Sequence, residues 1–533
     1  MRRIIKIALC AAAMITGANG QTGTVPQFVI NEAFSAGGSG HDEILGVETD
    51  FAGNIYVCGR FTDKFAAGPF DTLTSASSTG SNGFVAKFDY NGFLQWAEPI
   101  YSTNAALATD LTVDPMGNVY VVGMFYGEAN ISGNPLTGTM SEAFVAKYDP
   151  NGLIQWVVAA GGNGDEDYGM TIAYDKHHDW LFVGASVGGS ATFGTQTYVG
   201  GSTKNAVLAK YDPADGNCLQ VVGASDWGNS EPSDIAVRGN TVAFCGYIAG
   251  QVAFGDHTLN SGGMRDALFA TFSADSMICQ WASAGGGPGA DYASGVAFLP
   301  NGDLYFVGVV DSGGTFDGAY LSSTTGAYDF FIARYHGSGG IQWISKSQSS
   351  DRADSVRAPG DPPMYIAADD LGNAFVTGSF GDVSQLGPFS IVSNGLEDVF
   401  LAKIAPNDSV CWVKSYGGAK QDRAYAIDFT SQREILFAGY FNQEADYGIH
   451  HLISADTLAD GFVARAKEPH GLFITRPRKN GLMVIGEEYA ISWNSKNVGL
   501  ISIEYTATGP TGWTQIEPVV NAQDGHFLWT VPA

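Results

Sequence analysis

The chain is poor in basic residues and has no long apolar segment after its first twenty residues. Lys and Arg make up 27 of the 533 residues against 54 Asp and Glu, which gives a formal net charge of −27. Such a field repels nucleic acid and anionic membrane surfaces. No later run is long enough to span a bilayer, so membrane insertion is not expected. We read the acidity as a source of solubility, with cation binding or a basic partner as the alternative.

Paired cysteines and catalytic motifs are also missing. One of the six cysteines lies within the first twenty residues, which leaves an odd number, and no C-x-x-C occurs. A disulfide framework or a zinc site is therefore not expected. We find no G-x-S-x-G, P-loop, G-x-G-x-x-G, H-E-x-x-H or EF-hand loop. The histidine doublets at 177–178 and 450–451 could bind a metal across blades, but we expect them to be exposed loop pairs. The sequence thus predicts no catalytic residue and no cofactor, and favours a protein that is not an enzyme.

The first twenty residues have the pattern of an export signal. Arg2, Arg3 and Lys6 form a basic start, residues 4–15 are largely apolar, and small residues precede Gln21. We predict that residues 1–20 are a signal peptide. The mature protein is then expected outside the cell or at the cell surface.

A repeat of about 60 residues fills most of the chain. The motif A-K-[FY]-D begins at positions 86, 146 and 209, and degenerate copies begin at positions 270, 333, 402 and 464. Each copy reads as four short strands with Asp/Asn-Gly turns and period-2 alternation, and no helical stretch intervenes. A four-stranded meander repeated seven times predicts an all-β chain, a seven-bladed β-propeller over residues 21–467.

The last repeat stops after its third strand. The segment from Phe28 to Phe34, followed by Gly37-Gly38, has the pattern of the missing fourth strand. We expect this N-terminal strand to complete the seventh blade, which removes an open sheet edge.

The repeats carry two composite motifs, G-N-x-[YF]-V-x-G and A-K-[FY]-D-x-N-G-x-x-x-W. They resemble the bacterial SBBP-type β-propeller family, a resemblance that implies the fold and says little about function. The second motif is also similar to the docking motif of quinoprotein dehydrogenases, but its spacing differs. We interpret its Trp as an aromatic that packs between neighbouring blades.

Residues 470–533 have a different pattern of alternating strands that predicts a small Ig-like β-sandwich. This segment resembles the Ig-like module of Ser/Thr-rich GPI-anchored wall proteins and of surface proteins of Bacteroidetes-type bacteria. In that family a further strand follows the W-x-V-P motif, here Trp529 to Pro532, so we expect an incomplete module. The resemblance implies a secreted protein.

Two sets of residues are candidates for a site. An Asp stands before the first strand of five repeats and could either collect calcium or cap its own turn; the five are Asp42, Asp167, Asp291, Asp361 and Asp422. Two features break the repeat on the face with the long connections: Trp227, and the insertion at 358–363 that contains Asp361. We take Trp227 and Asp361 as possible ligand contacts, with loop drift as the alternative.

Three functions remain open at this point. The leading hypothesis is a monomeric secreted or cell-surface binding or adhesion protein whose loop-rich face meets an extracellular glycan or protein. A lyase, glycosidase or quinoprotein would instead place perturbed carboxylates, His or Arg at the central axis. A structural surface component is the third.

Overall fold

The computed structural model describes residues 28–66, 72–77, 80–162, 167–201, 204–225, 228–322, 328–349 and 364–467, together with short strands near both ends of the chain. The chain divides into a larger unit, Ile30–Ala466, and a smaller one, which combines Met1–Val29 with Lys467–Ala533. The described residues form strands and turns without a helix. Consequently, no described segment is a helix of the length and hydrophobicity that a membrane span would need.

The larger unit consists of antiparallel four-stranded meanders, seven in the part of the chain that the structure describes. Sheet 1 contains β4 (Glu43–Thr49), β5 (Ile55–Phe61), β8 (Asn82–Phe88) and β9 (Leu94–Ser102). Sheet 2 contains β10 (Ala106–Val113), β11 (Val119–Ile131), β12 (Asn134–Tyr148) and β13 (Ile154–Gly162). Sheet 3 contains β14 (Tyr168–Asp175), β15 (Trp180–Gly188), β18 (Lys204–Tyr211) and β19 (Cys218–Gly223).

The remaining sheets follow the same order. Sheet 4 contains β20 (Asn229–Arg238), β21 (Thr241–Ala249), β24 (Asp266–Ser273) and β25 (Cys279–Gly285). Sheet 5 contains β26 (Tyr292–Phe298), β27 (Leu304–Asp311), β30 (Tyr328–Tyr335) and β31 (Ile341–Lys346). Sheet 6 contains β33 (Met364–Ala368), β34 (Ala374–Phe380), β37 (Asp398–Ile404) and β38 (Val410–Gly418). Sheet 7 contains β39 (Arg423–Phe429), β40 (Ile435–Asn442), β43 (Ala459–Lys467) and the N-terminal β3 (Val29–Ala36), which lies beside β43.

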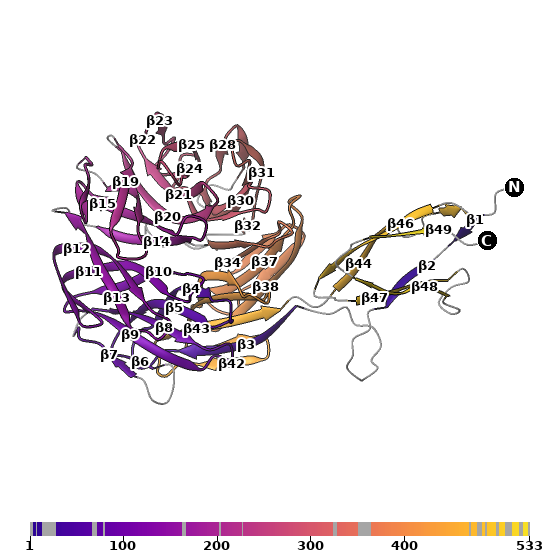
Figure 1. Cartoon of the computed structure of the whole chain (residues 1–533), viewed down its shortest axis with the longest axis horizontal. Helices are drawn as coiled ribbons and strands as arrows, with labels where there is room; N and C mark the ends of the chain where they lie inside the picture. The colour runs from indigo at the N-terminus through magenta and orange to yellow at the C-terminus, as the bar shows by residue number, and fades with distance from the viewer. Residues whose placement is uncertain are drawn as a thin grey trace. The chain divides into compact units, whose positions relative to one another are not determined.

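The sheets are arranged around a central axis, with their first strands innermost (Figure 1). Each first strand packs against the next, from β4 through β10, β14, β20, β26 and β33 to β39, and β39 packs against β4. Buried apolar side chains fill the spaces between neighbouring sheets; one such cluster joins Ile44 and Val57 of sheet 1 to Leu436 and Val463 of sheet 7. This is the arrangement of a β-propeller.

The long excursion between the second and third strands of a repeat is a hairpin rather than an irregular loop. The hairpins pair β6 (Lys64–Ala66) with β7 (Thr72–Thr74), β16 (Ala191–Phe193) with β17 (Gln196–Tyr198), β22 (Gln251–Phe254) with β23 (His257–Asn260), β28 (Gly314–Phe316) with β29 (Ala319–Leu321), β35 (Val383–Leu386) with β36 (Phe389–Val392), and β41 (Glu444–Tyr447) with β42 (His450–Ile453). In sheet 2 the paired ends of β11 and β12 take this place.

Each hairpin bonds to the outer end of the preceding sheet, so it covers an edge that would otherwise be open. β16 pairs with β13, β41 with β38, the end of β11 with β9, and β35 with the short β32 (Gln348–Ser349) that follows sheet 5. Single bridges join Ser225 to Ala253 and Gly286 to Thr315. The amide of Gly37, just after β3, donates to Ala66 of β6 at 3.1 Å. The hairpins therefore account for the unusual length of the repeat.

The repeated Lys and Trp also join neighbouring sheets. Lys147 Nζ and Trp156 Nε1 both donate to the carbonyl of Pro213 in the last turn of the next repeat, at 2.9 and 3.2 Å. Trp281 and Trp343 donate in the same way to Gly337 and Pro406. The Trp of the repeat thus packs between blades, as the sequence predicted.

The smaller unit contains two three-stranded sheets. One orders β44 (Gly471–Arg476), β46 (Glu488–Lys496) and β49 (His526–Thr530); the other orders β2 (Ala8–Ala12), β47 (Leu500–Thr506) and β48 (Thr514–Asn521). β1 (Ile4–Lys6) pairs with β45 (Leu482–Val484). Two strands from the predicted signal peptide therefore pair with C-terminal strands in this structure of the whole chain.

Candidate functional site

A cavity of about 610 Å³ lies on the axis of the larger unit, and the first strand of every sheet contributes to its wall. In six of the seven described first strands the register shifts at the same place, which marks a β-bulge. A bulge re-aims the side chains beside it. Five bulged residues face the cavity: Leu45, Thr109, Met170, Ser233 and Tyr425.

Four carboxylates line this cavity, and each accepts a backbone N–H from the sheet that follows its own. Glu48 accepts from Val113 at 2.6 Å, and Asp110 accepts from Ile172 at 2.9 Å. Likewise, Asp234 accepts from Val296 at 2.8 Å, and Asp428 of sheet 7 accepts from Thr49 of sheet 1 at 3.2 Å. These side chains therefore hold neighbouring first strands together as well as lining the cavity.

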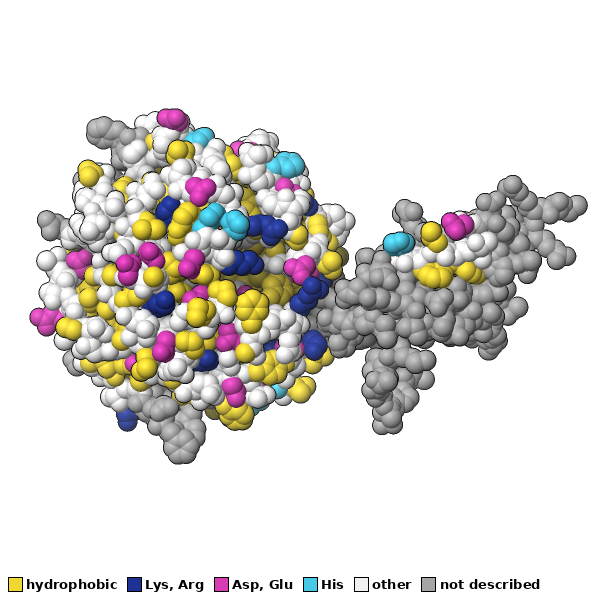
Figure 2. Space-filling view, in the orientation of Figure 1, with side chains coloured by type: hydrophobic (Ala, Val, Ile, Leu, Met, Phe, Trp, Pro, Cys, Tyr) yellow, Lys and Arg dark blue, Asp and Glu magenta, His cyan; other side chains and the backbone are white. Residues whose placement is uncertain are grey.

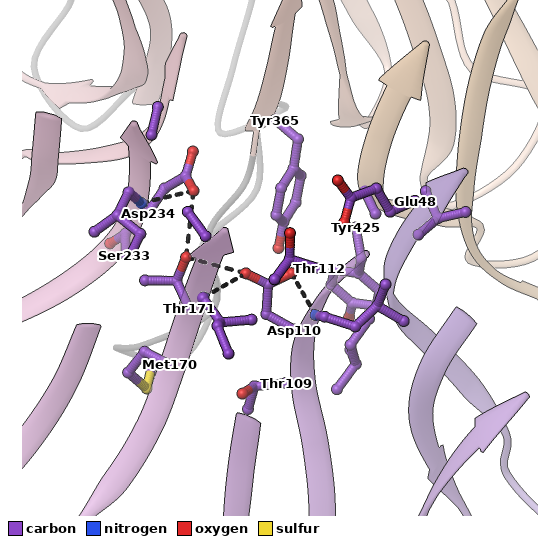
Figure 3. Close-up of a pocket in the computed structure, with 18 of the residues that line it drawn as sticks. Glu48, Thr109, Asp110, Thr112, Met170, Thr171, Ser233, Asp234, Tyr365 and Tyr425 are labelled. Atoms are coloured by element: carbon purple, nitrogen blue, oxygen red, sulfur yellow. Dashed lines mark hydrogen bonds between the residues drawn. The ribbon is translucent and has the colours of Figure 1, made fainter. Parts of the chain in front are cut away.

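Thr171 lies between two of these carboxylates (Figure 3). Its hydroxyl is 3.0 Å from Asp110 and 3.4 Å from Asp234. A hydroxyl has one hydrogen, so it can donate to only one carboxylate at a time. Thr171 can form hydrogen bonds with both carboxyl groups if its hydroxyl donates to one of them and the second, when protonated, donates to the Thr171 oxygen.

Burial raises the pKa of all four carboxyl groups, because few water molecules remain to solvate the charge. The pKa of Asp234 rises to about 8, through burial and then repulsion from Asp110, while backbone N–H donors oppose the rise. The pKa of Asp110 rises to about 6. Glu48 and Asp428 repel each other in addition, and the pKa of Glu48 is raised well above its ordinary value. Asp234 is therefore largely neutral at pH 7.

Tyrosine side chains line the cavity from two sides, Tyr168 and Tyr174 from sheet 3 and Tyr365 and Tyr425 from sheets 6 and 7. Tyr365 and Tyr425 both line the cavity, with their ring centroids 6.5 Å apart in an edge-to-face arrangement (Figure 3). The residues that line the cavity include neither Lys, Arg nor His. The cavity thus offers many acceptor oxygens and aromatic faces, and among the described residues it contains no cationic group that would attract an anion.

Most of the residues that the sequence singled out serve the turns or lie outside the described part. Trp227 and Asp361 lie outside the described residues. The other four Asp of the set are buried and cap backbone N–H groups; Asp167, for example, accepts from Gly162 at 2.8 Å and from Gly188 at 2.9 Å. Each of Asp42, Asp167, Asp291 and Asp422 therefore caps a turn, which is the second of the two roles considered from the sequence.

The histidine doublets show no metal geometry. His178 bonds to Asp175 at 2.6 Å and stacks on Trp180, so it is more buried than expected, whereas His451 bonds to Asp446 at the surface. Within the described ranges, no group of three His, Cys, Asp or Glu side chains could hold a metal ion. The cysteines at 58, 218, 245, 279 and 411 are free.

The outer surface shows no single apolar patch in the view of Figure 2. Hydrophobic side chains are scattered over this face, with Asp and Glu between them. Exposed apolar residues such as Phe51, Met116 and Ile449 stand in separate turns. Singly exposed residues of this kind are normal and need no partner.

Comparison with known proteins places the chain near other propellers. No family model matches it. An uncharacterized WD repeat-containing protein of Acanthamoeba polyphaga mimivirus is 25% identical over 144 residues, which is 23% of this chain and 10% of that protein. The chain therefore matches only a small part of that relative's length.

Solved structures are similar at the level of the fold. The Dos1 propeller has a TM-score of 0.41 at 9% identity and covers 83% of this chain and 95% of its own. A europium-containing methanol dehydrogenase has a TM-score of 0.38 at 12% identity, covering 83% and 93%, and the NanB sialidase of Streptococcus pneumoniae has 0.36 at 10%, covering 82% and 70%. These similarities concern the β-propeller fold alone and assign no activity to this chain.

The axial carboxylates were not predicted from the sequence. A signal was present, since Asp110 and Asp234 interrupt apolar first strands at equivalent places, directly after the bulge. Alternation alone does not show that the first strand of every repeat faces a shared axis.

Proposed function

We propose that this protein is exported and binds an extracellular carbohydrate, with a neutral glycan entering the axial cavity. The observation that carries the proposal is the wall itself: four carboxyl groups, a bridging Thr hydroxyl and four tyrosine side chains, without a cation. Sugar hydroxyls donate hydrogen bonds to such acceptors, and the ring C–H face of a sugar packs on an aromatic side chain. An acidic sugar would meet ionised carboxylates there and no cation to offset the repulsion.

Several features of the chain support the remainder of this proposal. The propeller would have seven blades closed by the N-terminal strand, since β3 lies beside β43 and β39 packs against β4. The smaller unit would be an Ig-like module that acts as a spacer or an accessory binder. Residues 1–20 would direct export, and the SBBP-type repeat motifs agree with an origin in secreted bacterial propellers. We expect the mature protein to be a monomer.

A binding screen tests the proposal. The purified chain is exposed to neutral and sialylated oligosaccharides, and hits are quantified by calorimetry for the wild type, Tyr365→Ala and Tyr320→Ala. Tyr320 is 70% exposed on β29, away from the cavity wall, and is the matched control. Loss of an aromatic contact should weaken binding by about tenfold in Tyr365→Ala only. Binding of acidic glycans alone, or equal loss in both variants, would exclude the cavity as the site.

A hydrolase that acts on the same ligand is the second candidate. Glycoside hydrolysis uses two carboxyl groups of which one is neutral, and the pKa of Asp234, at about 8, differs from that of Asp110, at about 6. Incubation of each bound glycan with the protein, followed by product analysis, separates the two candidates. Binding without cleavage leaves the first, and cleavage that Asp234→Asn abolishes establishes the second.

A further inference from the structure

Pairs of buried carboxyl groups face each other at four of the junctions between neighbouring sheets, away from the axial cavity. In each pair one member lies on the third strand of a sheet, and the other is the turn-capping Asp before the next sheet. Both approach the same glycine backbone. The pairs are Glu142 with Asp167, Asp266 with Asp291, Asp398 with Asp422, and Asp460 with Asp42.

The pair of Asp398 and Asp422 shows the arrangement in detail. A Cβ placed on Gly417 would lie 2.7 Å from Asp398 Oδ1 and 2.8 Å from Asp422 Oδ2, so both oxygens approach the same point of the backbone. Asp422 Oδ2 accepts from Gly418 at 2.6 Å, and its Oδ1 accepts from Asn442 at 3.1 Å. Both side chains are fully buried.

One oxygen of the pair has no hydrogen-bond donor. Asp398 Oδ2 accepts from the amide of Asn394 at 2.9 Å, whereas Oδ1 is buried without a partner. The same holds for Oδ1 of Asp266 and of Asp460, whose Oδ2 atoms accept from Gly262 and Ala455. A buried carboxylate oxygen that faces a second carboxylate and lacks a donor is strongly disfavoured unless something positive lies between them.

The chain itself shows what suits this position. Asn82 stands where Asp398 stands, since both oppose the last residue of the preceding strand, Phe61 and Phe380. Asn82 Oδ1 accepts the loop amide of Ala76 at 2.8 Å, and its Nδ2 donates to a carbonyl at 3.0 Å. A neutral side chain with one acceptor and one donor therefore fits, and a protonated Asp has this pattern of acceptor and donor.

A different solution occurs at the junction after sheet 5. Asp329 occupies the equivalent position, and Lys346 Nζ lies 2.6 Å from its carboxylate. Here an ammonium group supplies the positive charge. At the four junctions with a carboxyl pair, the described hydrogen-bond donors to the Asp side chains are backbone N–H groups. A carboxylate oxygen that accepts such an N–H group is less available to a metal cation.

We propose that each of the four pairs shares one proton, with the carboxyl group on the third strand donating to the carboxylate of the turn-capping Asp. The junctions between blades are then most stable in acid and weaken as the shared protons leave. The stability of the larger unit thus depends on pH through these junctions, which are separate from the axial site.

The groups that surround the pairs reinforce this behaviour. Burial raises the pKa of Asp398 to about 6 and that of Asp422 to about 7, and repulsion between them adds to the rise for Asp422. Tyr447 from the neighbouring hairpin faces this pair, and the ion pair of Glu397 with Arg423 lies next to it in the sequence. Tyr447 is neutral in this range, because burial and both carboxylates raise its pKa.

The other pairs have acidic neighbours as well. Asp311 faces the pair of Asp266 and Asp291, and Asp456 faces the pair of Asp42 and Asp460. Burial raises the pKa of Asp291 to about 7 and that of Asp42 to about 8. No cation among the described residues relieves these pairs, so their protons leave where the turn-capping groups titrate, with a pKa of about 7 for Asp291 and about 8 for Asp42.

The experiment measures urea unfolding of the full chain as a function of pH, for the wild type and Asp398→Asn. For a group whose pKa is raised in the folded state, stability is fully present below the unfolded pKa and is lost as the pH rises through the folded pKa. The wild-type unfolding constant should therefore rise with pH. The axial carboxylates contribute to this rise, and the variant isolates one pair. One proton that is bound only in the folded state makes the unfolding constant rise by about tenfold per pH unit. Asp398→Asn should remove this contribution, so its unfolding constant should rise less steeply with pH than that of the wild type.

Three controls make the result decisive. Asp266→Asn should reproduce the effect and replaces the first variant if that one does not fold. Asp329→Asn, whose partner is Lys346, should not reduce the pH dependence, nor should Asp256→Asn at an exposed turn. Unfolding is repeated with calcium and with EDTA. An unchanged pH dependence in Asp398→Asn and Asp266→Asn, or stabilisation by calcium that EDTA reverses, would overturn the proposal.

Discussion

Replacement of Thr171 by Val tests whether the axial carboxylates act as a bonded network. The side chain is 2% exposed, and its hydroxyl contacts Asp110 at 3.0 Å and Asp234 at 3.4 Å. Valine keeps the branched shape and removes the hydroxyl. Removal of a hydrogen bond to an ionised group costs about 1.5–3 kcal/mol. We therefore expect the free energy of unfolding of Thr171→Val to fall by about 2 kcal/mol at neutral pH.

The size of this loss should depend on pH. The pKa of Asp110 is about 6, so this carboxyl group is ionised at pH 7.5 and protonated at pH 5. A hydroxyl that donates to a carboxylate is held more strongly than one that donates to a neutral acid. Accordingly, the cost of Thr171→Val should be larger at pH 7.5 than at pH 5, as urea unfolding at both values would measure.

Thr271→Val is the matched control. Thr271 is also a fully buried threonine on a strand of the larger unit, but its hydroxyl has no described hydrogen-bond partner. Its replacement removes an unsatisfied polar atom, so we expect no loss of stability. Equal effects of the two substitutions, or a loss below about 0.5 kcal/mol in Thr171→Val, would refute the network.

Three further substitutions test how the sheets are joined, each by urea unfolding. Gly152→Ala should cost about 1–3 kcal/mol, because φ is +84° there and the new Cβ would lie 2.7 Å from the ring of Trp96; an unchanged midpoint would contradict this close approach. Trp156→Phe should cost about 1 kcal/mol through the lost bond to Pro213, and no loss would mean that this bond is dispensable. Phe34→Ala should cost about 2–4 kcal/mol, because this ring of β3 packs against Gly92 of sheet 1; proteolysis of β3 should become faster, and resistance equal to wild type would argue against closure.

The strands were predictable because their pattern repeats. Each copy of the repeat was expected to form four short strands, and the second copy forms them as β10, β11, β12 and β13. The N-terminal segment that was expected to follow the third strand of the last repeat lies there as β3, beside β43. Period-2 alternation and Asp-Gly turns are local signals, and seven copies of the same signal outweigh the weak evidence of any one copy.

The hairpins and the axial cavity were not predictable in the same way. The segment around Phe254 and His257 forms β22 and β23, and the bridge from Ala253 to Ser225 fixes it to the previous sheet. That pairing joins repeats and leaves no periodic trace within one copy. The same is true of the bond from Thr49 to Asp428, which brings together residues from the two ends of the larger unit.

The acidity of the chain acquires a structural cause from these observations. The sequence alone favours solubility as its purpose, but many carboxyl groups are buried at fixed places in the repeat. Some cap turns, as Asp114 does for Met116 and Asn118, and others bridge first strands or face each other at the junctions. A carboxylate can accept two or more N–H groups at once, and a chain of short strands and tight turns has many N–H groups to satisfy. The excess of acids over bases is therefore in part a consequence of the many backbone N–H groups in the turns and strand ends of the described sheets.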